Sequence, residues 1–351
     1  MKAISLFTGA GGMDLGFEAA GIDIIWANEF NADAVKTYQA NHPDTKVVHE
    51  DIRKAKQELV DYVGTDIVFG GPPCQGFSVA GKMNPDDERS TMVWEFFDAV
   101  AIVSPKAFVM ENVKALGELE RWQAVREKIF IRAKELGYSC FQIILNSANF
   151  GVPQKRERVF FVGIKGTHES NLSDVFQKIV EGKKRERVAL RDCLLKVGKA
   201  GTEQNPLSCT AKITLASNPV LRKSPYAGML FNGMGRPINF DGQANTLPAS
   251  MGGNKTPIVD ELLLHDPNAE NWIVKYHNEL SNGKEVDLSI EVPKHLRRLT
   301  IKEAAAIQTF PNDYIFCGEK SSIYRQIGNA VPCDLARVVA ESVLELLEKK
   351  N

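Results

Sequence analysis

The chain has 351 residues, of which 44% are hydrophobic and 25% charged, with a formal net charge of −1. This composition is that of an ordinary globular protein and excludes both a disordered chain and a membrane-embedded one. The near-zero net charge also excludes a globally basic nucleic-acid-binding protein, so any contact with a polyanion depends on locally clustered Lys and Arg.

The six cysteines lie far apart in the sequence, without the CxxC or His/Cys spacing of a zinc site. This usage favours reduced thiols in a cytosol over a disulfide framework or a metal centre. No apolar run reaches the length of a membrane span, and Met1 and Lys2 lead directly into a predicted strand without a signal peptide. We therefore expect a cytoplasmic protein that binds no metal and no membrane.

The N-terminal segment predicts a strand at 3–7, a glycine-rich turn at 8–12 and a helix at 13–20. Small residues in such a turn let the backbone approach a ligand, and the helix N-terminus offers unpaired N–H groups. This order is typical of nucleotide binding, although a tight turn without a ligand also fits the pattern.

Acidic residues follow the next two predicted strands. Glu29 comes shortly after a strand at 22–27 and Asp51 shortly after a strand at 46–49, with a helix at 31–41 between them. Either acid alone is ordinary as a surface group or a helix cap. Two acids at successive strand ends beside a glycine turn indicate a ligand with ribose hydroxyls. Because the chain lacks GxxxxGK[ST], we expect an adenosine without a triphosphate.

A stiff loop places a cysteine at the end of the following strand. The apolar run 65–69 predicts a buried strand, and the two glycines and two prolines at 70–73 exclude its continuation. Cys74 thus lies at the edge of an open α/β sheet, where ligands bind, and is a candidate nucleophile. A small buried core residue is the alternative. The polar stretch 80–91 is a candidate lid, or else a plain connector.

A third acid lies on the same predicted edge. A helix at 92–103 leads to a strand at 105–110, and Glu111 follows it, beside the strand that precedes Cys74. The next predicted elements are a helix and two strands, at 121–136, 139–146 and 159–163. Three basic residues just before the last strand form either a solvated face or a site for an anion or a carbonyl oxygen: Lys155, Arg156 and Arg158.

Beyond about residue 165 the regular alternation of strands and helices fails. Residues 198–257 are rich in Gly, Pro, Asn, Ser and Thr, which predicts a small irregular second domain with exposed loops. Basic residues on these loops suit the groove and phosphates of a duplex, namely Lys212, Arg222, Lys223, Arg236 and Lys255. A Thr300–Glu303 capping box predicts a helix at 301–308, and an apolar stripe predicts that a last helix at 333–349 docks on the first domain.

Several motifs together resemble the cytosine-C5 DNA methyltransferases, in the family's order and over nearly the whole chain. They are Phe7 to Gly12, Asn28 and Glu29, Asp51 and Ile52, Gly71 to Ser78 (GPPCQGFS), Glu111 to Val113 (ENV), Gln154 to Arg158 (QKRER), Arg297 to Thr300 (RRLT) and Gly328 to Pro332 (GNAVP). The succession of PPCQ, ENV and QxRxR is highly specific. The size and the single variable region resemble a bacterial restriction-modification enzyme.

The resemblance implies an α/β fold, with a Rossmann-like S-adenosylmethionine-dependent methyltransferase domain around a mixed, mostly parallel sheet. It assigns residues 1–187 and 296–351 to this catalytic and cofactor-binding domain. Residues 188–295 are assigned to a smaller, irregular target recognition domain. The implied methyl donor is S-adenosylmethionine, the product S-adenosylhomocysteine, and no metal takes part.

The implied reaction methylates C5 of a cytosine that is flipped out of a specific site in duplex DNA. Cys74 would add to C6 and so make C5 nucleophilic. Glu111, with a pKa raised by burial, would hydrogen-bond or protonate N3. Arg158 would hold O2, and Arg156 would help to position the base or the nucleophile.

The resemblance also implies binding residues. Glu29 would bind the cofactor ribose, Phe30 would pack on the adenine, and Asp51 and Ile52 would contact it. The other residues implied at the cofactor are Phe7, Gly9, Gly11, Gly12, Pro73, Asn329 and Val331. The residues implied at the DNA are Gln75, Ser78, Lys82, Arg89, Arg236 and Lys255.

We therefore expect a monomeric, nucleoid-associated bacterial enzyme that binds double-stranded DNA and has a restriction endonuclease as a genetic rather than physical partner. One alternative is a tRNA cytosine-C5 methyltransferase of the same family, which the long 188–295 insertion disfavours. The other is a catalytically inactive DNA-binding homologue, which the intact Cys74, Glu111, Arg156 and Arg158 disfavour.

Overall fold

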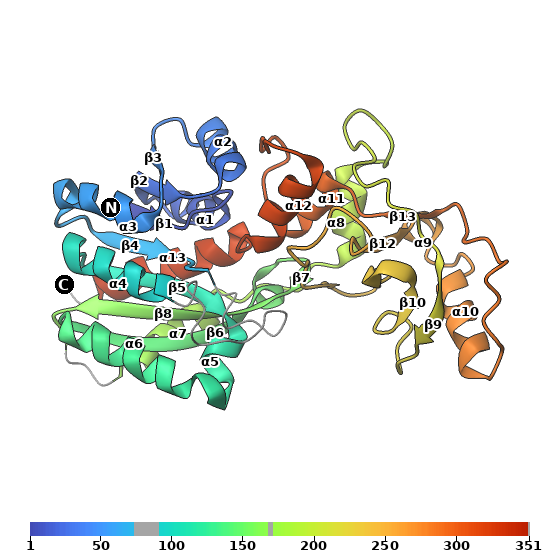
Figure 1. Cartoon of the computed structure of the whole chain (residues 1–351). Helices are drawn as coiled ribbons and strands as arrows, with labels where there is room; N and C mark the ends of the chain where they lie inside the picture. Colours follow the sequence, from blue (N-terminus) through green and yellow to red (C-terminus); the bar gives the residue numbers. More distant parts are fainter. Residues whose placement is uncertain (74–90, 168–170, 350–351) are drawn as a thin grey trace. The chain divides into compact units, whose positions relative to one another are not determined.

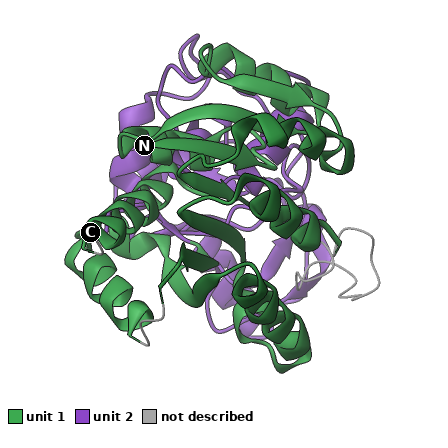
Figure 2. Ribbon diagram, turned by 90° about the vertical axis from the view of Figure 1, so that its left-hand side faces the viewer, with its two compact units in different colours: residues 1–150, 156–186, 331–351 green, residues 151–155, 187–330 purple. Residues whose placement is uncertain are grey.

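The computed structural model describes residues 1–73, 91–167 and 171–349. The chain divides into two compact units, which Figure 2 shows in different colours. Unit 1 comprises residues 1–150, 156–186 and 331–351, and unit 2 comprises residues 151–155 and 187–330. Each unit is described by itself.

A seven-stranded sheet forms the centre of unit 1 (Figure 1). Its strand order is β3 (Lys46–His49), β2 (Asp23–Glu29), β1 (Lys2–Leu6), β4 (Ile67–Gly70), β5 (Ala107–Val113), β8 (Glu157–Lys165) and β6 (Tyr138–Asn146). The first five strands are parallel to their neighbours, whereas β8 is antiparallel to both β5 and β6. The predicted α/β class with a mixed, mostly parallel sheet is confirmed.

Helices cover both faces of this sheet because consecutive strand residues point to opposite faces and both sets are apolar. In β5, Val109 belongs to one apolar cluster and Phe108 to the other. The first cluster is completed by α1 (Gly12–Ala19), α7 (Leu172–Gly182) and α13 (Cys333–Glu348). The second is completed by α3 (Ile52–Ala55), α4 (Met92–Val103), α5 (Lys114–Glu118) and α6 (Gln123–Glu135). Helix α2 (Ala32–Asn41) packs beside β2 and β3.

A glycine in α1 allows the last helix to dock closely. A Cβ at Gly16 would lie 2.4 Å from the backbone nitrogen of Arg337 and 2.5 Å from Cβ of Ala336. Because real Cβ atoms do not approach that closely, only glycine lets α1 and α13 pack at this distance. The predicted docking of the C-terminal helix on the first domain is thereby confirmed, with α7 packed beside α13 as well.

Gly163 of β8 is the tightest comparable position in the core of unit 1. It lies opposite Phe108 of β5, and a Cβ there would be 2.0 Å from Cε1 of that ring. We expect Gly163→Ala to lower the free energy of unfolding by about 1–3 kcal/mol, the usual cost of overpacking a core. Urea unfolding measures this effect. Gly182→Ala is the matched control, because a Cβ there meets nothing within 4 Å, and equal stability of the two variants would contradict the prediction.

Unit 2 is built from short elements. Its helices are α8 (Leu190–Val197), α9 (Glu261–His265), α10 (Trp272–Ser281), α11 (Ile301–Ile307) and α12 (Lys320–Asn329). Its strands pair in twos: β7 (Gln154–Lys155) with β11 (Ala244–Asn245), β9 (Leu215–Val220) with β10 (Met229–Phe231), and β12 (Ile258–Asp260) with β13 (Leu296–Arg298). Leu230, Ile258 and Ile273 lie in its apolar core. Short strands and connecting loops match the predicted irregular domain.

The return to the first unit differs from the predicted boundary at residue 296. Residues 296–330 belong to unit 2, and the chain rejoins unit 1 only at Val331. The reason is pairing: β13 pairs antiparallel with β12, and α11 packs on α8. After residue 165 the regular alternation of strands and helices ends, as expected, although α7, α8 and α10 are helices in this part of the chain. The capping box at Thr300 and Glu303 is present as predicted.

Candidate active site

The carboxyl ends of four parallel strands meet at one edge of the unit 1 sheet. Leu6 of β1 pairs with Asn28 of β2 on one side and with Gly70 of β4 on the other, and Gly70 pairs with Met110 of β5. The segments that follow these strands therefore lie side by side. Most residues predicted for the cofactor and for the reacting base follow these four strand ends or lie in them, which is where open α/β sheets bind ligands.

The turn after β1 has the backbone shape that its glycines allow. Gly9 and Gly11 have φ values of 57° and 77°, and Phe7 has a φ of 55°. Gly11 is the N-cap of α1 and makes no side-chain capping hydrogen bond. The turn thus leads into a helix N-terminus, and a Cβ at Gly9 would meet nothing within 4 Å, so there is open space beside the turn.

A buried carboxyl group that is not among the residues predicted from the sequence supports this turn. Asp14 of α1 accepts hydrogen bonds from the hydroxyl of Thr8 (2.7 Å) and from the hydroxyl of Tyr38 on α2 (3.0 Å). Burial raises the pKa of Asp14, while the charge of nearby His42 opposes the rise. An acidic residue in the first turn of an apolar helix is the only sequence signal for such a group.

Glu29 connects the end of β2 to the glycine turn. Its Oε2 accepts a hydrogen bond from the backbone N–H of Gly9 (2.8 Å), and its Oε1 accepts one from Asn31 (2.7 Å). Burial raises the pKa of this carboxyl group, although the backbone hydrogen bonds oppose the rise. The carboxylate is therefore held beside the turn. The neighbouring Phe30 ring is 71% exposed and free to pack on a planar ligand.

Asp51 has a structural role of its own. It is the N-cap of α3, accepts a hydrogen bond from the backbone N–H of Arg53 and forms an ion pair with the Arg53 side chain at 2.5 Å. This side-chain hydrogen bond with Arg53 lowers the pKa of Asp51. The alternative of a helix cap, raised from the sequence, thus applies to Asp51, while Ile52 after it is buried.

Glu111 and Arg158 form an ion pair at the carboxyl end of β5. Arg158 Nε lies 2.8 Å from Glu111 Oε1, and both side chains are largely buried. The antiparallel register explains the contact: Arg158 of β8 pairs with Val113, and Glu111 is the next residue on the same face of β5. Burial raises the pKa of Glu111, while the charges of Arg158 and Arg156 oppose the rise.

The loop before Cys74 lies in close contact with the carboxyl end of β5. Asn112 donates a hydrogen bond to the carbonyl oxygen of Pro72 at 3.2 Å. A Cβ at Gly71 would lie 2.9 Å from Oε2 of Glu111, so a side chain there would displace the carboxyl group. Arg156 is 1% exposed, and its backbone pairs with Ser147. Sequence positions 71, 111, 156 and 158 are thereby brought to one place.

Several predicted site residues lie outside the described residues. They are Cys74, Gln75, Ser78, Lys82 and Arg89, together with the candidate lid except for its last residue, Thr91. Pro73 is the last described residue before them. Their assigned roles stay predictions.

The last two predicted cofactor residues belong to different units. Val331 is 6% exposed and packs in the apolar cluster of unit 1. Asn329 is exposed at the C-terminal end of α12 in unit 2.

The predicted DNA-contacting residues of unit 2 are exposed, and two of them lie on adjacent segments. Gly235 donates its N–H to the carbonyl of Asn254 (3.0 Å), and Ile258 donates to the carbonyl of Arg236 (2.9 Å). Arg236 and Lys255 thus extend from neighbouring loops. The other three basic residues singled out from the sequence, Lys212, Arg222 and Lys223, are exposed as well.

Within residues 1–73, 91–167 and 171–349, no group of three or more His, Cys, Asp or Glu side chains is placed to hold a metal ion. None of the helices in these ranges combines the length and the apolar character needed to cross a bilayer.

The family described as C-5 cytosine-specific DNA methylase matches residues 1–345 of this chain. Type II methyltransferase M1.HphI from Haemophilus parahaemolyticus is 33% identical over 98% of this chain and 86% of its own length. Type II methyltransferase M.FnuDI from Fusobacterium nucleatum is also 33% identical, over 100% of this chain and 96% of its own.

Solved structures share the fold. The S. pombe Dnmt2 methyltransferase superposes with a TM-score of 0.64 at 19% identity, covering 100% of this chain and 99% of that one. A Spodoptera frugiperda DNMT2 mutant superposes with a TM-score of 0.65, also at 19% identity, over 99% of each chain.

Proposed function

Because the chain belongs to the C-5 cytosine-specific DNA methylase family and is a DNA cytosine methyltransferase, we propose that Cys74 and the Glu111–Arg158 pair carry out its reaction. The observation that supports this most is the buried ion pair at the end of β5. It lies beside β4, whose continuing loop leads to Cys74.

The reaction starts at the pyrimidine ring. The Cys74 thiolate forms a bond to C6, and the ring electrons move so that C5 becomes nucleophilic. S-adenosylmethionine supplies the electrophilic methyl group, which C5 takes up, and S-adenosylhomocysteine leaves. Transfer of the C5 proton to solvent water then leaves its electron pair to re-form the C5–C6 double bond, which breaks the C6–S bond, releases the Cys74 thiolate and restores the aromatic ring. No metal is required in this sequence of steps.

Negative charge develops at N3 and O2 of the base when the thiolate adds, and the ion pair provides the groups to meet it. Burial raises the pKa of Glu111, so that its carboxyl group can be protonated and can donate to N3. Arg158 offers its guanidinium to O2. Its ion pair with Glu111 also keeps the carboxyl group of Glu111 oriented. The buried Arg156 helps to position the base or the nucleophile.

The glycine turn and the residues beside it fit the methyl donor. Gly9, Gly11 and Gly12 leave room for the ligand beside the helix N-terminus, and Glu29, which accepts a hydrogen bond from the N–H of Gly9, is held there for the ribose hydroxyls. The exposed Phe30 ring packs on the adenine. Since Asp51 is engaged by Arg53, Ile52 and the backbone of Asp51 are the stronger adenine contacts.

We also propose a cellular role for this protein. The target recognition domain lies in residues 188–295, and the enzyme protects host DNA in a restriction-modification system whose endonuclease is a genetic partner. The protein acts as a cytoplasmic, nucleoid-associated monomer. Bisulfite sequencing of plasmid from cells that express the chain tests this, because it reports both the target site and the methylated base.

The substrate class is tested by methyl transfer from labelled S-adenosylmethionine to duplex DNA and to tRNA, side by side. We expect label in duplex DNA. Label in tRNA alone would overturn the assignment to DNA.

Exposed cations of unit 2 should bind the DNA backbone. We expect the Arg236→Ala/Lys255→Ala double variant to raise KM for duplex DNA. The plot of the logarithm of the DNA association constant against the logarithm of salt concentration should become less steep by about 2, because each phosphate contact releases about one counterion. Fluorescence anisotropy over a salt series measures this. The control is Lys275→Ala/Lys284→Ala, since these two exposed lysines are paired with Glu270 and Glu279. A parallel loss in both pairs would contradict a specific contact.

A further inference from the structure

Arg298 is a buried arginine whose guanidinium donates hydrogen bonds to three backbone carbonyls. It lies in β13 and is 3% exposed. Its Nη1 donates to the carbonyl of Thr256 (2.8 Å), its Nη2 to Lys212 (3.2 Å) and its Nε to Ala211 (3.3 Å). One planar, rigid group thus joins two loop segments that are more than forty residues apart in the sequence, between 211–212 and 256.

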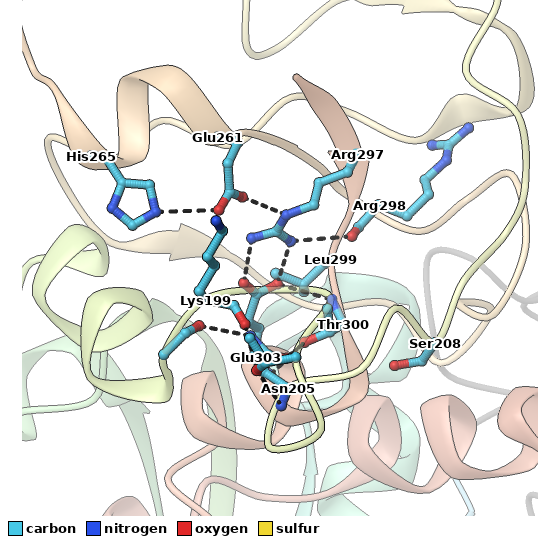
Figure 3. Close-up of polar contacts among 12 residues, drawn as sticks. Lys199, Asn205, Ser208, Glu261, His265, Arg297, Arg298, Leu299, Thr300 and Glu303 are labelled. Atoms are coloured by element: carbon cyan, nitrogen blue, oxygen red, sulfur yellow. Dashed lines mark hydrogen bonds and ion pairs between the residues drawn. The ribbon is translucent and has the colours of Figure 1, made fainter. Parts of the chain in front are cut away.

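The neighbouring arginine does something different. Arg297 forms ion pairs with Glu261 of α9 (2.5 Å) and Glu303 of α11 (2.6 Å), as Figure 3 shows. Glu303 also closes the capping box with Thr300. In Figure 3 the side chain of Arg298 points away from this group. Arg297 therefore joins helices of unit 2, whereas Arg298 forms hydrogen bonds to its loops.

The loop at 252–256 is shaped around Thr256, which is fully buried. Its hydroxyl accepts a hydrogen bond from Gly252 N–H (2.9 Å), and its own N–H donates to the carbonyl of Gly253 (3.0 Å). This turn presents Asn254 and Lys255 to the outside. Since Arg298 holds the carbonyl of Thr256, it holds the base of the turn.

A second loop, at 232–236, rests on the first. A Cβ at Gly233 would be 2.1 Å from Cβ of Asn254, so only glycine permits this contact. A Cβ at Gly235 would be 2.2 Å from Nη1 of Arg298, which places the guanidinium directly under this loop too. Between the two glycines, Met234 is 59% exposed with a φ of 68°, a conformation that a side chain adopts only when its surroundings impose it.

Each of the three segments at the guanidinium carries an exposed cation. Lys212 follows Ala211, Lys255 precedes Thr256, and Arg236 follows Gly235. A loop cation can meet a defined phosphate or base only if its backbone is held in place. Three hydrogen bonds from Arg298 to carbonyl oxygens, one of them buried and two partly buried, provide that restraint without using any exposed side chain.

We propose that Arg298 is a positioning residue for DNA recognition, whose guanidinium sets the relative placement of the loops that carry Lys212, Arg236 and Lys255. This inference rests on the proposed action on duplex DNA. It concerns the fit of the loops to a site rather than the chemistry at the base.

The test is Arg298→Lys, which keeps the positive charge. It replaces the planar guanidinium, which donates to three carbonyls, by a compact ammonium group that cannot reach all three in the same geometry. We expect KM for duplex DNA to rise about tenfold or more, and discrimination against single-mismatch sites to fall by about tenfold, the scale of one base-pair readout. We expect kcat at saturating DNA to fall less than about threefold, because the group makes no contact at the base.

Arg297→Lys is the matched control, since it weakens the helix contacts beside the same position. It should lower the unfolding temperature while KM for DNA and mismatch discrimination stay at wild-type values. If Arg298→Lys does not fold, Gly235→Ala disturbs the same guanidinium from the loop side and should raise KM in the same way.

Two results would overturn this inference and leave the proposed function standing. One is a wild-type KM for DNA and wild-type mismatch discrimination in Arg298→Lys. The other is changes in kcat and KM equal to those of Arg297→Lys. A wild-type chain that does not methylate duplex DNA would overturn the proposed function, and this inference with it.

Discussion

A Cys74→Ser variant is expected to bind S-adenosylmethionine with nearly wild-type affinity and to transfer almost no methyl groups. The hydroxyl of serine is a much weaker nucleophile than a thiolate, so the bond to C6 would not form. Turnover should fall by about 10⁴-fold or more, the scale on which removing a covalent nucleophile acts. Transfer of labelled methyl groups to duplex DNA, with calorimetric titration of the methyl donor, measures both quantities.

The matched control is Cys140→Ser, which changes a thiol in β6 whose pKa is raised by burial, so that it stays protonated and unreactive. This variant should keep wild-type turnover. Duplex DNA with 5-fluorocytosine at the target adds a direct test, because fluorine at C5 blocks the proton loss that releases the enzyme. Mass spectrometry should then find the adduct on the peptide that contains Cys74. An adduct on another cysteine, or near-normal turnover of Cys74→Ser, would refute the covalent mechanism.

Glu111→Gln is expected to lose turnover by about 10²-fold or more, the usual contribution of a general acid, without loss of fold. The amide can still accept from Arg158, but it cannot transfer a proton to N3. In the wild-type enzyme the required protonated carboxyl is present below its raised pKa and is lost as pH rises through that value. We therefore expect kcat to decline on the alkaline side of a pH profile, and the residual activity of Glu111→Gln to lack this decline.

Glu157→Gln is the control for this result. Glu157 precedes Arg158 in β8, and its carboxylate forms an ion pair with Lys114 at the surface. Its loss should change turnover and pH profile little. An unchanged rate in Glu111→Gln, or an equal loss in Glu157→Gln, would remove Glu111 from the proposed mechanism.

The residue pattern was sufficient to predict much of unit 1. Alternating apolar strands and helices predicted the sheet, and the helix at 92–103 and the strand at 46–49 have the predicted bounds. The family, the fold class and the enzyme class inferred from the motifs are confirmed. These features are local: strand periodicity, glycine turns and short motifs are set by neighbouring residues, which a sequence displays directly.

The contacts that make a site depend on residues far apart in the chain. The antiparallel placement of β8 beside β5 brings Arg158 to Glu111, and the packing of α2 brings Tyr38 to Asp14. Pairing of β13 with β12 draws residues 296–330 into unit 2 and puts Arg298 under two loops. The sequence by itself determined which groups are available for the proposed chemistry, because chemical identity belongs to each residue. Only the tertiary structure decided which of them meet, because burial and register arise from the packing of distant segments.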